Sequence, residues 1–198
     1  MIKNVHDFLR NIIIFIFKPF IKILEYFNAS PNFISITGFL INFAVLYLLA
    51  KSQIFIAGFV ILFAGLFDML DGYIARNQNK VTKFGALLDS TLDRYSELII
   101  FLGLGIYYYK LQNPMVLLAI FFTISGSLLI SYVRARAEGL GLDCKVGLIQ
   151  RPERVVLLAL GCFLPTGSMQ YILYFLALST NFTVIQRILH VWKVSNSK

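Results

Sequence analysis

Residues 54–76 read IFIAGFVILFAGLFDMLDGYIAR, and they set the fold class. Every residue before Asp68 is apolar or glycine, and the segment is long enough to cross a bilayer core, which takes about 20 residues of helix. Two carboxylates, Asp68 and Asp71, nevertheless lie near its end. A carboxylate inside a membrane span is costly and usually marks a functional site. The segment therefore predicts a transmembrane helix with a functional site near one end.

The composition of the whole chain supports a membrane protein. Of its 198 residues, 58% are hydrophobic and only 14% are charged, whereas about a quarter of the residues in soluble domains are charged. A soluble domain of this length could not bury so much apolar surface, so the excess must face lipid. We predict an all-α integral membrane protein with a single domain over residues 1–198.

Apolar segments and turn signals divide the chain into six predicted transmembrane helices within residues 31–192. The segment 155–192 is too long for one span, and Pro165-Thr166-Gly167 marks a turn inside it. The predicted spans are 33–50, about 54–76, about 84–109, about 113–135, 155 to about 164, and about 168 onward.

The first 30 residues differ from these spans. Within residues 5–28 the apolar run is broken by charged residues and a proline, a pattern that suits a helix lying along the membrane surface. We therefore predict an N-terminal interfacial amphipathic helix over residues 1–30. The interrupting residues are Arg10, Lys18, Pro19, Lys22 and Glu25.

The net charge of +8 is distributed along the chain rather than gathered in one patch, so we predict no nucleic-acid partner. The N-terminus, the loops at 76–83 and 134–154 and the C-terminus are basic, and basic loops stay on the cytoplasmic side of a membrane. We predict a multi-pass cell-membrane protein whose aspartates face the cytoplasm.

Four of the ten acidic residues lie at or inside two predicted spans. Asp68 and Asp71 are three residues apart, and Asp89 and Asp93 are four apart, so each pair lies on one helical face. The connecting loop is short, so the two helices should be antiparallel neighbours. All four carboxylates are then expected to converge near the cytoplasmic surface.

Four unpaired carboxylates would repel one another in a low dielectric, and divalent cations would remove that repulsion. Oxygen ligands suit Mg²⁺ or Mn²⁺. Ion pairs with Arg76 and Arg94 are the alternative, but they would account for only two of the four acids. Gly72 and Gly85 permit close approach of a ligand, and the Arg76 guanidinium can bind phosphate oxygens.

The segment from Asp68 to Asp93 reads Asp-x-x-Asp-Gly-x-x-Ala-Arg, then eight residues, then Gly-x-x-x-Asp-x-x-x-Asp. It resembles the full signature of the CDP-alcohol phosphotransferase family at every fixed position. The resemblance implies two metal ions held by the first three aspartates, with the fourth able to join them. It also implies that Asp93 is the general base for an acceptor alcohol, that CMP leaves, and that the protein is a homodimer.

The same resemblance assigns a group of residues to the CDP-lipid. Ser35 stands where the family usually has threonine and keeps the hydroxyl. Two of these assignments have simpler alternatives, because Pro31 and Asn32 could form a plain helix cap and Thr82 could be a solvated loop hydroxyl. The assigned residues are Pro31, Asn32, Ser35, Gly72, Ala75, Arg76, Thr82 and Gly85.

Arginines near other span ends point to the acceptor. The segments Ser-Tyr-Val-Arg-Ala-Arg-Ala-Glu (131–138) and Arg-Pro-Glu-Arg (151–154) resemble the phosphatidylinositol phosphate synthase branch and its archaeal ether-lipid counterparts. The resemblance implies that Arg134, Arg154 and Arg187 bind the phosphate of inositol phosphate. Each arginine alone could instead be a snorkelling positive-inside residue.

We therefore expect transfer of the phosphatidyl group from CDP-diacylglycerol to 1-myo-inositol phosphate. Glycerol 3-phosphate is an alternative acceptor because it also carries a phosphate, and an ether lipid is an alternative donor. A cation channel or transporter is a remote alternative that requires a polar path across the membrane, whereas the predicted carboxylates cluster near one face.

Overall fold

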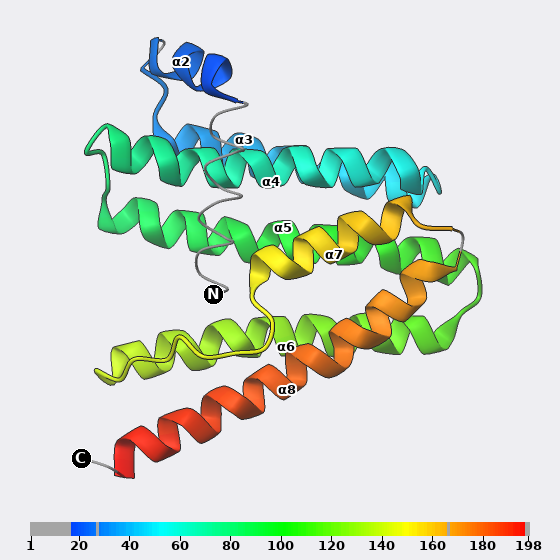
Figure 1. Ribbon diagram of the computed structural model, residues 1–198. Helices are drawn as coiled ribbons and strands as arrows, with labels where there is room; N and C mark the ends of the chain where they lie inside the picture. The colour runs from blue at the N-terminus through cyan, green and yellow to red at the C-terminus, as the bar shows by residue number, and fades with distance from the viewer. Residues whose placement is uncertain (1–16, 27, 166, 197–198) are drawn as a thin grey trace.

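The computed structural model describes residues 17–26, 28–165 and 167–196, and this part of the chain is helical with no strand. Figure 1 shows the long helices running roughly side by side. The helices are α2 (Lys18–Tyr26), α3 (Pro31–Ala50), α4 (Ile54–Asn77), α5 (Lys83–Lys110), α6 (Pro114–Gly139), α7 (Arg151–Phe163) and α8 (Ser168–Asn196).

The predicted spans all correspond to helices, but the structure supports membrane crossing for four of them. By length and composition, α3, α4, α6 and α8 can span a bilayer. Helix α7 has 13 residues and is about 20 Å long, shorter than a bilayer core of about 30 Å. Helix α5 is long enough, yet its first half carries the charged residues of the site. The prediction of six spanning helices is confirmed only in this coarser form.

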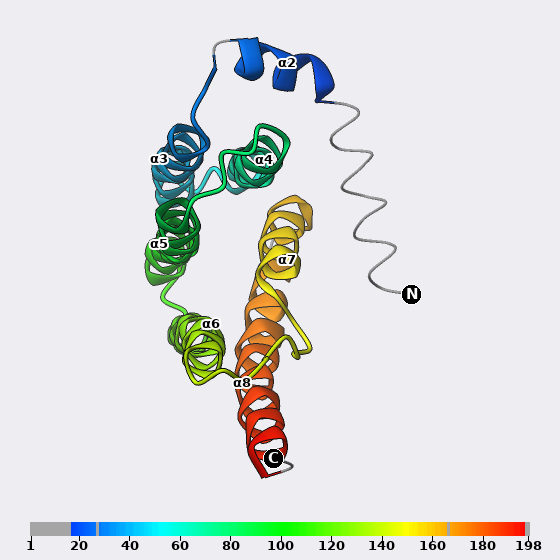
Figure 2. The ribbon, with the colours of Figure 1, turned by 90° about the vertical axis from the view of Figure 1, so that its left-hand side faces the viewer.

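The predicted interfacial helix falls partly outside the described residues, because residues 1–16 are not among them. Its described part, α2, lies above α3 and α4 in Figure 2 and runs crosswise to the long helices. Ile21 is buried and contributes to a core cluster with residues of α3 and α4, whereas Ile23 and Tyr26 are exposed. This one-sided burial is consistent with an amphipathic surface helix.

Two groups of helices build the molecule. Helices α3, α4, α5 and α7 surround a common space when viewed end-on, and α6 pairs with α8 beside them (Figure 2). Helix α3 packs along both α4 and α5, and α7 packs along α4 and α8. At the α6–α8 contact Gly126 permits close approach, since a Cβ there would lie 2.4 Å from the Thr180 Oγ1 atom.

Local capping fixes where the functional helices begin. The Ser30 side chain caps α3 by accepting a hydrogen bond from the Phe33 N–H (3.2 Å), and Pro31 occupies the first turn, where its missing N–H costs nothing. Thr82 caps α5 by accepting from the Gly85 N–H at 2.9 Å. Glu153 in the first turn of α7 accepts from the Gln150 N–H at 3.0 Å.

Large apolar side chains cover the outer faces of the helices. Phe55, Phe59, Phe121 and Phe175 are each more than half exposed, which a soluble protein of this size would avoid on such a scale. A lipid environment makes this exposure favourable, so the surface agrees with the membrane assignment from composition.

Candidate functional site

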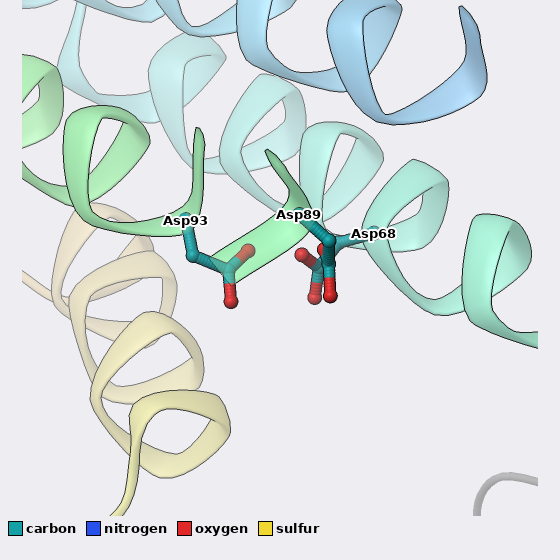
Figure 3. A group of neighbouring side chains, drawn as sticks. All are labelled: Asp68, Asp89 and Asp93. Carbon is teal, nitrogen blue, oxygen red and sulfur yellow. The ribbon is translucent and has the colours of Figure 1, made fainter. Parts of the chain in front are cut away.

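Three aspartates converge between two helices. Asp68 on α4 and Asp89 and Asp93 on α5 each offer a carboxylate oxygen, and these three oxygens lie within 4.8 Å of one another. Figure 3 shows the three side chains directed toward one another. The four-residue spacing of Asp89 and Asp93 places both on one face of α5, as the sequence predicted.

The two helices that carry the aspartates are antiparallel, as predicted, but they are not directly packed neighbours. Helix α3 lies against both of them, and α4 and α5 face each other across a gap. The short 78–82 connection fixes their direction but not their separation. This separation leaves room for the carboxylates and for a ligand between the helices.

The gap is a cavity of about 710 Å³. All four aspartates of the signature line it, together with Ser35 of α3 and polar residues of α5 and α7. The rest of its wall is mostly apolar and comes from α3, α4 and α7; it includes Phe39, Phe59, Phe63, Leu66 and Val155. The cavity therefore joins a cluster of acids to a surface suited to hydrocarbon chains.

Asp71 lies beside the trio rather than in it. It is 4% exposed, and its carboxylate accepts a short hydrogen bond from the Ser35 hydroxyl. The hydroxyl that replaces the family's usual threonine thus orients one of the four acids. Asp71 lines the same cavity as Asp68 and Asp89, so a small ligand there could contact all of them.

Arg151, at the start of α7, neutralises two members of the trio. Its Nη1 atom lies 2.8 Å from Asp68 Oδ1 and 2.6 Å from Asp93 Oδ1. Sequence reasoning assigned no role to Arg151 and considered Arg76 and Arg94 as counter-ions. Arg94 does pair with Asp93, at a longer distance of 3.9 Å. The missed signal was the position of Arg151, one helical turn before an arginine that had been selected.

Glu97 is a second residue that sequence reasoning missed. It follows Asp93 by one turn, is 4% exposed, and accepts hydrogen bonds from Arg154 Nε (2.6 Å) and Nη2 (2.8 Å) and from the Ser127 hydroxyl (2.6 Å). The four-residue spacing of Asp89 and Asp93 continues to Glu97, which was the available signal. A buried ionised pair needs such complete bonding to offset its desolvation.

The donor set of the trio fits a divalent cation. Carboxylate oxygens are the preferred ligands of Mg²⁺ and also suit Mn²⁺, and three of them already lie close enough to share one ion. The guanidinium of Arg151 already places a positive charge beside two of these carboxylates. The residues therefore fit the predicted metal chemistry.

Residues assigned to the CDP group lie at the starts of α3 and α5. A Cβ on Gly85 would lie 2.9 Å from Thr82 Oγ1 and 3.1 Å from Asn32 Oδ1, so these three residues are brought together. The Thr82 hydroxyl is a helix cap rather than a free loop hydroxyl.

The other CDP residues lie on α4, one to two turns from the trio. A Cβ on Gly72 would lie 3.2 Å from Arg76 Nη2, which means that the guanidinium folds back over the glycine. Ala75 is half-buried, and Arg76 is exposed. Pro31, in contrast, begins α3 as an ordinary first-turn proline.

The three arginines predicted for the acceptor differ in their surroundings. Arg134 is exposed and pairs with Glu138 at 2.8 Å. Arg154 and Arg187 are buried, and Arg187 donates to the backbone oxygens of Val146 (2.9 Å) and Ile130 (2.6 Å).

The sequence is similar to those of two synthases over most of its length. It is 33% identical to the archaetidylinositol phosphate synthase of Methanothermobacter thermautotrophicus over 186 residues, covering 89% of this chain and 93% of that protein. It is 34% identical to the phosphatidylinositol phosphate synthase of Mycobacterium tuberculosis over 175 residues, covering 83% and 80%.

Solved structures of the second of these synthases are also similar to the structure of this chain. The crystal structure of the Mycobacterium tuberculosis phosphatidylinositol phosphate synthase with CDP-DAG bound matches with a TM-score of 0.82 at 32% identity, covering 88% of this chain and 92% of that one. A structure of the same enzyme in complex with manganese and citrate matches with a TM-score of 0.80.

The signature and the trio of aspartates agree with a match to a family model. Residues 28–194 match the model of CDP-alcohol phosphatidyltransferase, which covers α3 to α8 and the whole site. The resemblance drawn from the aspartate spacing is therefore confirmed. The chain belongs to the CDP-alcohol phosphatidyltransferase family.

Proposed function

We propose that this enzyme is a phosphatidylinositol phosphate synthase, which transfers the phosphatidyl group of CDP-diacylglycerol to 1-myo-inositol phosphate and releases CMP. The observation that carries the proposal is the trio of Asp68, Asp89 and Asp93 in a cavity whose remaining wall is largely apolar. Such a cavity suits a substrate with a diphosphate at one end and hydrocarbon at the other. Relatives that match most of the chain are named for this chemistry.

Two divalent ions, Mg²⁺ or Mn²⁺, would be held by Asp68, Asp71, Asp89 and Asp93. When bound, such ions neutralise the charge that develops on the diphosphate oxygens. The chain's own contribution is to orient the carboxylates, and the Ser35 hydroxyl does this for Asp71.

Asp93 acts as the general base on the acceptor side. Its carboxylate takes the proton of the acceptor hydroxyl, and the oxygen attacks the phosphorus that carries the diacylglycerol. The bond from that phosphorus to the CMP oxygen breaks, and CMP leaves. General bases of this kind contribute about 10²–10⁴-fold to a rate.

The CDP group lies toward the starts of α3 and α5. Arg76 contacts phosphate oxygens, and Asn32, Thr82 and Gly85, which lie together, contact the nucleotide. Gly72 has no side chain, so the protein backbone can approach the nucleotide closely at this position. The acyl chains lie along the apolar wall formed by α3, α4 and α7.

The acceptor phosphate is bound by Arg134, Arg154 and Arg187. Arg154 supports this role because its Nη1 atom is buried and has no hydrogen-bond partner within the described residues. An unpaired buried donor is costly, and a phosphate oxygen would satisfy it. Arg134 is exposed and supplies further positive charge.

An ether-lipid donor is the second candidate. The observation in its favour is the likeness to an archaetidylinositol phosphate synthase across 93% of that protein. The two candidates share the acceptor and differ only in the linkage of the hydrocarbon chains.

We infer that the six helices α3 to α8 are embedded in the membrane, with the short α7 crossing only part of the bilayer core. We also infer an active site open to the cytoplasm and a homodimer. The basic loops at 76–83 and 134–154 support this orientation, because they join the ends of the helices that carry the acids and arginines. The exposed apolar faces offer surface for both lipid and a second copy.

An acceptor comparison tests the proposal. The purified enzyme in detergent with CDP-diacylglycerol and Mg²⁺ should release CMP with 1-myo-inositol phosphate and should do so much more slowly with glycerol 3-phosphate or unphosphorylated inositol. Faster turnover with glycerol 3-phosphate would reject the inositol assignment. Faster turnover with an archaeal CDP-ether lipid than with CDP-diacylglycerol would favour the second candidate.

A further inference from the structure

We propose that Arg151 competes with divalent cations for Asp68 and Asp93, so that it sets the metal affinity of the site and moves away from both carboxylates when metal binds. The inference rests on the proposed metal role of the aspartates. It assigns Arg151 as a positioning residue, because it acts through the carboxylates and not on the substrate.

The first support is that one nitrogen contacts both acids. Arg151 Nη1 lies 2.8 Å from Asp68 Oδ1 and 2.6 Å from Asp93 Oδ1. These acids come from different helices, and both belong to the trio whose oxygens lie within 4.8 Å of one another. A single positive centre already bridges α4 and α5 as a metal ion would, so cation and guanidinium use the same oxygens.

The second support is that little else holds the guanidinium. The Nε atom of Arg151 is buried without a hydrogen-bond partner in the described part of the chain, and its ion pairs are with the two aspartates. Arg151 also lines the 710 Å³ cavity. A divalent ion at the trio would repel the guanidinium, and the cavity offers it a place to move.

The third support is that other contacts hold α7 in position when the ion pairs of Arg151 with Asp68 and Asp93 break. Arg154, three residues later on the same helix, binds Glu97 of α5 through two nitrogens. The backbone of α7 also packs along α4 and α8. Arg151 can therefore change partners by moving its side chain alone.

Mn²⁺ binding to the purified enzyme in detergent tests this competition, measured by the EPR signal of free Mn²⁺. Arg151→Gln should bind Mn²⁺ about tenfold more tightly or better than the wild type, since a charge adjacent to two carboxylates is removed. Arg151→Lys keeps a cation and should stay near the wild type. Arg136→Gln, which removes the same charge from an exposed arginine of α6, is the matched control and should bind like the wild type.

The outcomes separate this inference from the proposed function. Unchanged or weaker Mn²⁺ binding by Arg151→Gln, with normal binding by the wild type, would overturn the competition and leave the metal site intact. Absence of Mn²⁺ binding by the wild type would overturn the metal site and the competition together.

A second measurement needs no variant and remains decisive if Arg151→Gln does not fold. Phenylglyoxal modifies accessible guanidinium groups, and peptide mass spectrometry reports the modification of each arginine. In the wild type, Mn²⁺ should increase the modification of Arg151 and leave that of the exposed Arg136 unchanged. Equal or lower modification of Arg151 with Mn²⁺ would overturn the displacement.

Discussion

Asp93 lies beside charges of both signs. Asp68 and Asp89 bring negative charge within 4.8 Å, and Arg151 brings positive charge at 2.6 Å. A base must reach its acceptor hydroxyl with a free oxygen. Removal of Arg151 from Asp93 would provide that oxygen on the acceptor side.

Replacing this base gives the first prediction. Asp93→Asn should lower the rate of CMP release by about 10²-fold or more, because the amide cannot take the proton. Thermal unfolding in detergent should show that the variant is folded. Mn²⁺ should still raise its unfolding temperature, because the ion binds to the remaining acids. Asp143→Asn, at an exposed residue of the 140–150 connection, is the control and should keep full activity. Normal CMP release by Asp93→Asn would remove Asp93 from the base role.

The exposed arginine of the acceptor group gives the second prediction. Arg134→Ala should raise the KM for inositol phosphate more than the KM for CDP-diacylglycerol, because it removes a phosphate contact from one substrate only. Its partner Glu138 is half exposed, so the loss should cost little stability. Arg136→Ala, a neighbouring exposed arginine, should leave both KM values unchanged. Equal increases for both substrates would contradict an acceptor pocket.

Individual side chains show why part of the site could be predicted. The spacing of Asp89 and Asp93 alone placed them on one helical face, and the trio confirms it. Arg151 could not be chosen in this way, since it lies 83 residues from Asp68 and meets it only through the packing of α7 on α4. Long-range pairs of this kind depend on tertiary arrangement and not on local periodicity.

Helices α5 and α7 are joined by two levels of arginine–carboxylate pairs. Arg151 binds Asp93, and one turn along both helices Arg154 binds Glu97. The second pair is buried on both sides, with side-chain exposures of 3% and 5%. We call Arg151–Asp93 the outer pair and Arg154–Glu97 the inner pair. We infer that metal binding breaks the outer pair, while the inner pair fixes the spacing of the helices.

Breaking the inner pair, compared with replacing both of its members, gives the third prediction. Glu97→Gln should destabilise the protein by about 3–5 kcal/mol, because it leaves the buried Arg154 charge unpaired. The double variant Glu97→Leu/Arg154→Met should be more stable than Glu97→Gln, since it buries no lone charge. Thermal unfolding in detergent measures both. Equal destabilisation by the single and double variants would contradict a paired inner charge.

The element boundaries followed from composition, whereas the arrangement of the elements did not. The apolar segments and Pro165 separated the helices within a few residues of their observed ends. The 78–82 connection showed that α4 and α5 run antiparallel, but not that α3 lies against both. Connection length limits direction and reach, and side-chain packing decides which helices touch.

The whole molecule combines a polar centre with an apolar exterior. The cavity of about 710 Å³ opens among α3, α4, α5 and α7, while large aromatic side chains remain exposed on the outer faces. Hydropathy predicted the exterior, but nothing in it predicted that α7 is too short to cross a bilayer core by itself.

Membrane orientation gives the fourth prediction. In spheroplasts, a cysteine at Lys80 should resist a membrane-impermeant maleimide until the cells are opened, because the 76–83 loop is expected in the cytoplasm. A cysteine at Ser52, in the opposite link, should react at once. The native Cys144 and Cys162 are buried and should contribute little background. The reverse pattern would contradict a cytoplasmic active site.

Anomalous diffraction at the manganese edge, from crystals of the enzyme grown with Mn²⁺, locates the metal. The metal role of the aspartates predicts a peak about 2–2.3 Å from carboxylate oxygens of Asp68, Asp89 and Asp93, as expected for a hard divalent ion bound by oxygen. The Arg151 guanidinium should have left these oxygens. Absence of a peak at the site, with Arg151 still bridging Asp68 and Asp93 at saturating Mn²⁺, would contradict the metal role of the aspartates.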